Sequence, residues 1–328
     1  MKKRQLGLNG PEVSAIGLGC MGMSEFYGKS DDEKSKKLIT GALENGVTML
    51  DTADTYGHGH NEQLVATALK EWSGEVFIAT KFGICRKKGV YERTINGHPE
   101  YVRQAAEASL KRLKREIIDL YYIHRIDATV PVEETVGAMA ELVQQGKVRY
   151  IGISEASVST IRKAHAVHPL TALQTEYSLC TRHVEEEILP VLRELGIGFV
   201  AYSPLGRGFL TGKINDVEEF DEGDFRKKNP RFQGNNFAQN QELVRKIQEI
   251  AEQKKITPAQ AVIAWLLSKG DDIVPIPGTR QMKYLMENLE AAKIHFSEQE
   301  ICEIESAVPL DEIKGERYPE AGMAGIDQ

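Results

Sequence analysis

The stretch VTMLDTADTYGHGHNEQLVATALKEWSGEVFIATK, residues 47–81, decides the fold that we expect for this chain. It opens with a short apolar run that ends at Asp51. A segment with helical spacing of its apolar residues (61–72) follows, and a second apolar run (76–81) closes the stretch. Strand, helix and strand in succession are typical of a parallel sheet with helices packed on it. The stretch therefore predicts one unit of such a sheet.

The same alternation continues along the chain. The candidate strands are SAIGLG (14–19), VTMLD (47–51), VFIATK (76–81), IDLYYIH (118–124), VRYIGIS (148–154), LTALQTE (170–176), IGFVAYS (197–203) and DIVPIP (272–277). Segments with helical period separate them, with Pro99 at a predicted helix start and Gly46, Gly146 and Gly196 at predicted helix ends. Eight repeats favour closure into a single (β/α)8 TIM barrel that spans residues 1–328.

Two segments lie outside this alternation. RQLGLNGPEVSAIGLG (4–19) predicts an N-terminal β-hairpin around Asn9 and Gly10. After the seventh strand, residues 206–240 show little periodicity and many Gly, Asn and charged residues. A loop of that length is a lid over a binding site or a disordered insertion. We favour a lid, because barrel active sites lie at the carboxyl ends of the strands.

Composition excludes several functional classes. The 41 Lys and Arg against 48 Asp and Glu give a formal net charge of -7, with no long basic run, so we expect no nucleic-acid partner. No apolar run approaches the ~18 residues of a membrane-spanning helix, and the basic start lacks the apolar core of a signal peptide. We expect a cytoplasmic protein whose four cysteines, which lack CxxC spacing, are reduced.

Asp51 at the end of its strand admits three interpretations. In the first, Gly17, Gly19 and Gly22 form a GxGxxG pattern, and Asp51 binds the ribose of a dinucleotide fold. That pattern needs a helix to begin within it, but MSEFYGKS (23–30) intervenes. Asp51 also follows Gly22 at a distance of 29 residues, where about 20 are usual.

In the second interpretation His58, His60 and His124 bind a metal ion. The first two lie in a Gly-rich turn past the strand end instead of on the strand, which is poor geometry for a barrel metal site. We expect no metal. The two histidines are then polar loop residues, and Asn61 or a neighbour caps the helix that follows.

The third interpretation is a proton-handling site. Asp51, Lys81 and His124 each end a candidate strand, and Tyr56 follows Asp51 in the same loop. A lysine at the end of an apolar strand needs an anion, which Asp51 on the adjacent strand would supply. We expect the four side chains to meet at one mouth of the barrel, where the Lys81 ammonium would lower the pKa of the Tyr56 phenol although desolvation opposes it.

These residues lie in motifs that resemble the aldo-keto reductases over nearly the whole chain. The motifs are LDTADTYG, IATKFG, LYYIHRID, VRYIGISEAS, LQTEYSL, AYSPLGRGFLTGK and IPGTRQMKYLMENLEA, in family order. GLGCMGMS, HRIDATVPVEETVGAM and GERYPE look most like the branch that contains plant perakine reductases and related bacterial reductases. The resemblance implies NADPH-dependent reduction of a small aldehyde or ketone. Tyr56 would then be the proton donor, Lys81 and Asp51 would tune it, and His124 would orient the carbonyl.

The resemblance also implies a set of cofactor-binding residues. Ser154 and Gln174 match positions that hold the nicotinamide carboxamide, and Tyr202 matches the residue stacked on its ring. Ser203, Leu205, Arg207 and Lys213 fall in the pyrophosphate segment, and Gly278, Thr279, Arg280, Glu287 and Asn288 fall in the adenosine-phosphate segment. The residues support part of this independently. PLGRGFLTGK (204–213) combines glycines with two cations, and PGTRQMKYLMEN (277–288) leads a strand end into a helix N-terminus, which favours anions.

Two positions depart from the family pattern. Glu155 follows Ser154 where many relatives have Asn, and we assign it no role. Tyr284 stands where many relatives hold the 2'-phosphate with an arginine, so Arg280, with Lys283, is the candidate for that contact. A second hypothesis is a regulatory subunit that binds NADPH with little turnover.

Loops 81–100, 126–131 and 206–240 would form the substrate pocket, with Cys85 and Tyr91 as candidate lining residues. The sequence of these loops does not identify the substrate, and the oligomeric state is equally open.

Overall fold

The computed structural model describes residues 1–87, 90, 92–323 and 325–327. Within these residues, eight strands form one parallel sheet, and each overlaps its predicted range. In spatial order they are β3 (Leu18–Gly19), β4 (Met49–Asp51), β5 (Phe77–Phe82), β8 (Ile118–Ile123), β9 (Val148–Ser154), β10 (Ala172–Glu176), β11 (Gly198–Tyr202) and β12 (Ile273–Pro275). The predicted (β/α)8 architecture is confirmed.

The first and last strands meet through two glycines. The Gly17 amide donates to the Pro275 carbonyl at 2.9 Å, and the Gly19 amide donates to the Pro277 carbonyl at 3.4 Å. A Cβ on Gly19 would lie 2.8 Å from the Ile276 carbonyl oxygen, so a larger residue would push the two segments apart. These glycines therefore serve barrel closure. They do not begin a dinucleotide-binding helix, because the next α-helix starts only at Asp32.

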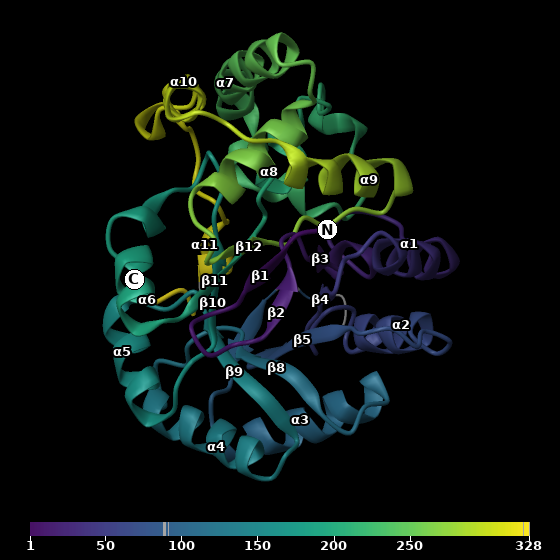
Figure 1. Cartoon of the computed structure of the whole chain (residues 1–328), viewed down its shortest axis with the longest axis vertical. Coiled ribbons are helices and arrows are strands. Elements are labelled where there is room, and N and C mark those ends of the chain that lie inside the picture. Colours follow the sequence, from purple (N-terminus) through teal and green to yellow (C-terminus); the bar gives the residue numbers. More distant parts are fainter. Residues whose placement is uncertain (88–89, 91, 324, 328) are drawn as a thin grey trace.

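Helices surround the sheet, as Figure 1 shows. They are α1 (Asp32–Glu44), α2 (His60–Ala68), α3 (Pro99–Leu113), α4 (Val132–Gln144), α5 (Val158–Val167), α6 (Ile188–Leu195), α8 (Pro258–Ser268) and α9 (Met282–Glu290). In the same view α7 (Gly234–Gln253) and α10 (Glu298–Ala307) lie outside this ring, at the top, and α11 (Glu320–Met323) belongs to the C-terminal tail. Pro99 opens α3, and Gly46, Gly146 and Gly196 have positive φ at helix ends, as predicted.

The helix α2 was predicted to be capped by Asn61 or a neighbour, and Asn61 itself is the wrong alternative. The N-cap of α2 is Gly59, which has no side chain to accept a hydrogen bond. Asn61 is fully buried instead, and its amide group donates to the Cys20 carbonyl at 2.9 Å and to Ser24 Oγ at 2.7 Å. It also accepts a hydrogen bond from Thr52 Oγ1. The side chain thus ties α2 to the loops on either side, because a buried amide must satisfy its own donors and acceptor.

Side chains on the strands alternate between two apolar layers. Met49, Ala79 and Leu120 point into the barrel, whereas their neighbours Leu50 and Ile78 pack outward against helices. The predicted N-terminal hairpin, β1 (Lys3–Gln5) and β2 (Glu12–Ser14), contributes Leu6 and Val13 to the inner layer. Its Leu8 amide donates to the Gly196 carbonyl just before β11, so the hairpin covers the amino ends of the strands and leaves the carboxyl ends to the site.

The segment after the seventh strand is more ordered than its sequence indicates. Residues 206–232 form four short 3-10 helices (Gly206–Thr211, Val217–Glu219, Phe225–Lys228 and Pro230–Phe232), and α7 already begins at Gly234 instead of after residue 240. Phe209, Phe225, Phe232 and Phe237 are all buried. Phe209 packs edge to face against both Phe232 and Phe237, so a small aromatic cluster holds the segment together.

Candidate active site

Three of the four predicted catalytic side chains point into the barrel at the carboxyl ends of adjacent strands. Asp51 ends β4 two residues after Met49, Lys81 lies two residues after Ala79 in β5, and His124 directly follows β8. Because side chains two residues apart share a face, each continues the inward-facing row of its strand. Tyr56 reaches the same place from the loop after β4.

The four side chains are buried and in contact. Lys81 Nζ donates to Asp51 Oδ1 at 2.5 Å and to the Thr52 carbonyl at 2.7 Å, and it lies 3.4 Å from the Tyr56 hydroxyl. The rings of Tyr56 and His124 meet edge to face with centroids 5.8 Å apart. Lys81 is fully buried and Asp51, Tyr56 and His124 are nearly so. The structure therefore brings together the residues that the strand ends predicted.

The pKa values differ in one respect from expectation. Burial lowers the pKa of Lys81, and Asp51 opposes that shift. Burial raises the pKa of Tyr56 well above its usual value, and the nearby Asp51 carboxylate adds to the rise. The predicted net fall in the Tyr56 pKa is therefore wrong for this state of the protein, since the charge of Lys81 is already matched by Asp51. Burial and the surrounding cations hold the pKa of His124 well below 6.5, so its imidazole is neutral at physiological pH.

A cleft with a volume of about 420 Å³ opens from this cluster. Tyr56 and His124 line one part of it, and Lys213, Glu287 and Asn288 line another. All twelve residues that the resemblance implies for cofactor binding line the same cleft: Ser154, Gln174, Tyr202, Ser203, Leu205, Arg207, Lys213, Gly278, Thr279, Arg280, Glu287 and Asn288. They come from four strand ends, the loops after them and helix α9, which the barrel places on one rim.

The cleft residues differ in how their polar groups are engaged. Gln174 donates to Asp51 Oδ2 at 2.7 Å, which ties the predicted carboxamide contact to the buried Lys81–Asp51 pair. Lys213 pairs with Glu287 at 3.0 Å and lies over the Tyr284 ring. Arg280 donates to the Lys29 carbonyl at 2.6 Å. The N-terminus of α9, which begins at Met282, has no side-chain cap, so its free amides add to the positive potential there.

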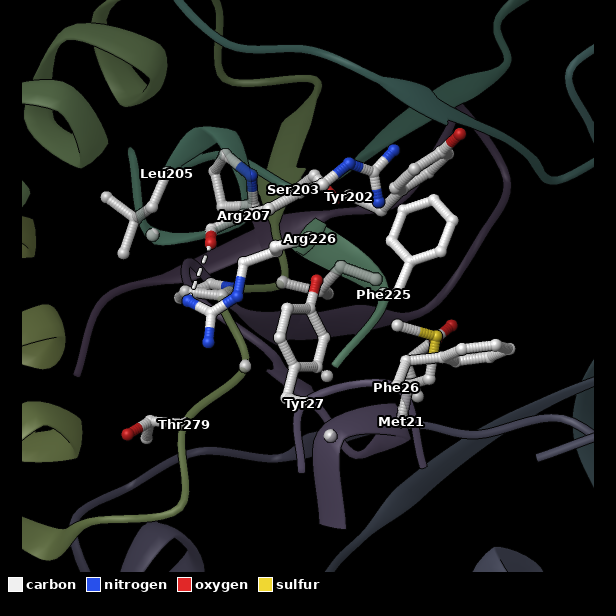
Figure 2. A pocket seen from close by; sticks show the side chains of 18 of the residues that line it. Met21, Phe26, Tyr27, Tyr202, Ser203, Leu205, Arg207, Phe225, Arg226 and Thr279 are labelled. Carbon is white, nitrogen blue, oxygen red and sulfur yellow. Dashed lines mark hydrogen bonds between the residues drawn. The ribbon is translucent and has the colours of Figure 1, made fainter. Parts of the chain in front are cut away.

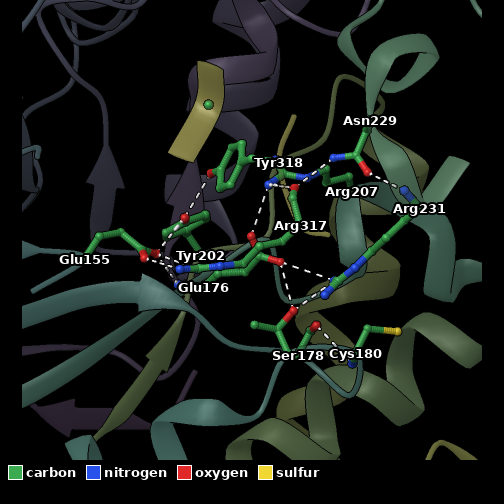
Figure 3. Close-up of polar contacts among 12 residues, drawn as sticks. Glu155, Glu176, Ser178, Cys180, Tyr202, Arg207, Asn229, Arg231, Arg317 and Tyr318 are labelled. Carbon is green, nitrogen blue, oxygen red and sulfur yellow. Dashed lines mark hydrogen bonds and ion pairs between the residues drawn. The ribbon is translucent and has the colours of Figure 1, made fainter. Parts of the chain in front are cut away.

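Glu155 is the centre of a buried network that sequence reasoning missed (Figure 3). Its carboxylate accepts two hydrogen bonds from Arg317, at 3.0 and 2.7 Å, and one from the Tyr202 hydroxyl at 2.7 Å. The Tyr318 hydroxyl lies 2.9 Å from that of Tyr202. Despite burial, the arginines hold the pKa of Glu155 at about 2. The acid that departs from the family pattern thus fastens the C-terminal tail to the cleft wall.

Arg207 belongs to a neighbouring part of this network. Its guanidinium pairs with Glu176 at 3.0 Å and lies over the ring of Tyr318. Glu176 also receives Arg231 at 3.5 Å. Arg207 therefore lines the cleft, as predicted, but its charge is already paired with a buried carboxylate.

Two loops meet over the cleft, as Figure 2 shows. Phe26 and Tyr27 come from the loop after β3, and Phe225 and Arg226 come from the segment after β11. The Phe225 amide donates to the Phe26 carbonyl at 2.8 Å, and the Arg226 guanidinium lies 5.2 Å from the centre of the Tyr27 ring. The predicted lid segment is therefore ordered, and it covers the cleft jointly with a second loop.

Other predicted features lie elsewhere. His60 bonds Ser24 and Asp32 at the start of α2, His58 is exposed, and the described residues contain no cluster of His, Cys, Asp or Glu that could hold a metal ion. Cys85 does not line the cleft, because strand side chains alternate and its neighbours Ile84 and Arg86 face it instead. Tyr91 lies outside the described residues. No helix in the described ranges is both long and apolar enough to span a membrane.

Arg125 also lines the cleft, although sequence reasoning left it out. It follows His124 in the chain and is 4% exposed. Its position, a charged residue directly after an apolar strand, carried the same signal as that of Lys81. Arg317 and Tyr318 carried no comparable signal, because more than 100 residues separate them from their partners.

Several known proteins are similar to this chain in sequence or in structure. The family model described as the aldo/keto reductase family matches residues 15–309. A probable aldo-keto reductase of Glycine max is 50% identical over 316 residues, which are 96% of this chain and 91% of the relative. Among solved structures, a glycerol dehydrogenase of Gluconobacter oxydans has a TM-score of 0.85 at 27% identity and covers 94% of this chain and 96% of its own. The holo form of a Bacillus halodurans aldo-keto reductase has a TM-score of 0.77 at 27% identity, with 94% and 97% covered.

Proposed function

The chain belongs to the aldo/keto reductase family of NAD(P)-dependent oxidoreductases, and on that premise we propose that it uses NADPH to reduce small aldehydes and ketones to alcohols. One observation carries the proposal. Tyr56, Lys81, Asp51 and His124 form a buried cluster on a cleft whose wall also carries the cations Lys213 and Arg280. Such a cleft joins a proton donor to a binding place for phosphate groups.

The cleft residues fit a nicotinamide dinucleotide phosphate. Ser154 and Gln174 offer buried polar groups on neighbouring strands, Gln174 contacts Asp51, and Tyr202 offers a ring whose hydroxyl reaches Tyr318 of the tail. Lys213, Arg280 and the uncapped start of α9 offer positive charge and free amides for phosphates. When bound there, the cofactor supplies the hydride that the carbonyl carbon accepts.

The residues of the chain would supply the proton and hold the substrate. At neutral pH the raised pKa keeps the Tyr56 hydroxyl protonated, so the hydroxyl carries the proton that it would donate to the carbonyl oxygen. Lys81 Nζ, 3.4 Å from that hydroxyl, stabilises negative charge on the phenol oxygen as the proton leaves. Asp51 fixes the position of the ammonium, and the neutral His124 can donate a hydrogen bond to the carbonyl.

The two loops that cover the cleft would exclude water from it. Phe26 and Phe225 place apolar rings at the cleft 6.0 Å apart, held by the backbone hydrogen bond between the two residues. Excluding water from the reacting groups strengthens the electrostatic contacts of Lys81 and His124. The aromatic cover therefore supports proton transfer from a fixed side chain.

The proposal is tested with purified protein, NADPH and an activated aromatic aldehyde such as 4-nitrobenzaldehyde. We expect Tyr56→Phe to lower kcat by roughly 10²- to 10⁴-fold with little change in NADPH affinity, because only the hydroxyl is removed. Tyr121→Phe is the matched control. Tyr121 is also buried, but it packs outward and its hydroxyl donates to the Val102 carbonyl at 3.4 Å.

Three outcomes separate the alternatives. A large loss in Tyr56→Phe, with Tyr121→Phe close to wild type, supports the proposal. Equal slow oxidation of NADPH by wild type and Tyr56→Phe contradicts it. Tight NADPH binding without turnover of any aldehyde or ketone would favour a regulatory subunit instead.

A further inference from the structure

The environment of His124 contains more positive charge than the proposed reaction uses. The cations that depress the pKa of this histidine, after burial, are Arg125, Lys81, Arg93 and Arg86. Three of them, Arg86, Arg93 and Arg125, line the cleft beside Tyr56 and His124. A neutral aldehyde needs none of these arginines for hydride or proton transfer.

Lys81 and Arg86 are among these cations, and the chain itself neutralises both. Lys81 pairs with Asp51, and Arg86 pairs with Glu25 through both carboxylate oxygens. Arg125 forms no ion pair within the described ranges. The carboxylate that acts on it is Glu155, whose oxygens are already engaged by Arg317 and Tyr202. Burying a guanidinium without a counter-ion costs free energy. A bound anion that supplied the missing negative charge would remove this cost.

The side chain of Arg125 is held in place for such a ligand. Its Nη1 donates to the His124 carbonyl at 2.7 Å and lies 3.4 Å from Ser154 Oγ. Its Nε is buried and has no hydrogen-bond partner in the part of the chain that the structure describes. The C-terminal tail packs closely against Arg125, because a Cβ added to Gly325 would lie only 2.8 Å from the Arg125 Cβ. The guanidinium is thus fixed beside the residue that would orient the carbonyl, with donors left over.

We propose that Arg125 binds a carboxylate of the substrate, so that the enzyme prefers carbonyl compounds that carry a carboxylate close to the reacting carbonyl, such as short oxo acids. Arginine suits this task because its planar donors match a carboxylate and its charge is permanent. The inference rests on the proposed function and narrows its substrate class.

Matched pairs of substrates test the proposal. With NADPH, kcat/KM is measured for phenylglyoxylate against methyl phenylglyoxylate, and for 4-formylbenzoate against methyl 4-formylbenzoate. A carboxylate withdraws electron density from the reacting carbonyl less strongly than its ester does. The intrinsic reactivity of the carbonyl therefore favours the ester. We expect an acid-to-ester ratio above one for the wild type in at least one pair. A ratio below one in both pairs overturns the proposal.

Variants assign the preference to Arg125. We expect Arg125→Met to lower the acid-to-ester ratio about 10- to 100-fold, as for loss of a charge-assisted hydrogen bond, and Arg125→Lys to retain part of it. The ratio is internal to each variant, so a general loss of active protein cancels. Arg226→Met is the control, because Arg226 lines the same cleft but is paired with Asp224, and its ratio should stay at the wild-type value. An unchanged ratio in Arg125→Met overturns the proposal.

A binding measurement separates this inference from the proposed reaction. Thermal unfolding is followed with phenylglyoxylate or its methyl ester, each with and without NADPH. Stabilisation of the wild type by the acid, absent for the ester and absent in Arg125→Met, supports the carboxylate site even if no carbonyl compound is turned over. If the neutral esters are reduced in a Tyr56-dependent way but the acid neither stabilises the protein nor is preferred, the carboxylate site fails and the reductase proposal stands.

Discussion

The Lys81 ammonium lies 2.5 Å from the Asp51 carboxylate, and both side chains are buried at the carboxyl end of the barrel. Removing one member of a buried pair leaves the other charge without compensation, which costs about 3–5 kcal/mol. We expect Lys81→Met and Asp51→Asn each to lower the free energy of unfolding by that order. The double variant should lose less than the sum of the two, and urea unfolding of all four proteins measures the difference.

An exposed pair provides the control for this cycle. Arg162 and Glu194 form an ion pair on the surface, where water screens both charges. Arg162→Met and Glu194→Gln should change the free energy of unfolding little, singly or together. Strict additivity of the Lys81 and Asp51 effects would show that the two charges do not depend on each other.

The buried cluster of Asp51, Tyr56, Lys81 and His124 could be predicted because its signal is local. An acid, a lysine and a histidine that each end an apolar strand are hard to explain singly, and parallel strands bring their ends together. The Glu155 network could not be predicted in this way. Arg317 approaches from a tail 162 residues further along the chain, and no periodicity or spacing connects the two. The position of the tail follows from packing, which a local pattern does not contain.

The fold also has a part that local sequence patterns predict and a part that they do not. Eight short apolar runs predicted eight strands, because alternation of strand and helix is visible within each repeat. The sequence of the segment after β11 shows little periodicity, because its apolar residues are aromatic and widely spaced. Phe209, Phe232 and Phe237 pack on one another only after the chain has turned several times, so their contacts have no linear signature. The early start of α7 at Gly234 was hidden by the Gly and Asn residues of its first turn.

Asp54 should make the protein less stable as the pH rises. Burial raises its pKa to about 8 and the Glu62 carboxylate adds to the rise, while Oδ1 has no hydrogen-bond partner among the described side chains and backbone. Above pH 3.8 the unfolded chain releases this proton, whereas the folded protein holds it until about pH 8, so the contribution of Asp54 to stability falls across that window.

We therefore expect Asp54→Asn to be more stable than the wild type at pH 8, by about 2 kcal/mol or more, with the gain disappearing towards pH 4. Chemical unfolding at several pH values measures it. Asp127→Asn is the control of opposite sign, because hydrogen bonds from Thr129 and Gly97 outweigh burial and lower the pKa of Asp127. A gain in Asp54→Asn that does not vary with pH would contradict the assignment.

Arg280 is expected to determine the preference for NADPH over NADH. It lines the cleft at the start of α9, and its only described hydrogen bond runs to the Lys29 carbonyl, which leaves other donors for a phosphate. Arg280→Met should raise KM for NADPH about 10- to 100-fold, as for loss of a charge-assisted contact, and leave KM for NADH nearly unchanged. Steady-state kinetics with both cofactors measures the two constants. Equal increases for both would place Arg280 in general folding of the loop instead of phosphate binding.

Gly28 should control how long the cofactor stays bound. Its φ is +81°, and a Cβ there would lie 2.1 Å from Asp221 Oδ2, which also accepts a hydrogen bond from the Lys29 amide. Gly28→Ala would therefore push apart the two loops that meet over the cleft, and we expect NADPH to dissociate about tenfold faster, since an opened cover shortens residence time. Stopped-flow fluorescence of bound NADPH measures the rate. Gly223→Ala is the matched control, because Gly223 has nearly the same φ of +83° in the opposing segment but no atom within 4 Å of its Cβ position. If both variants release NADPH at the same rate, backbone strain alone accounts for the change and the contact between the loops does not hold the cofactor.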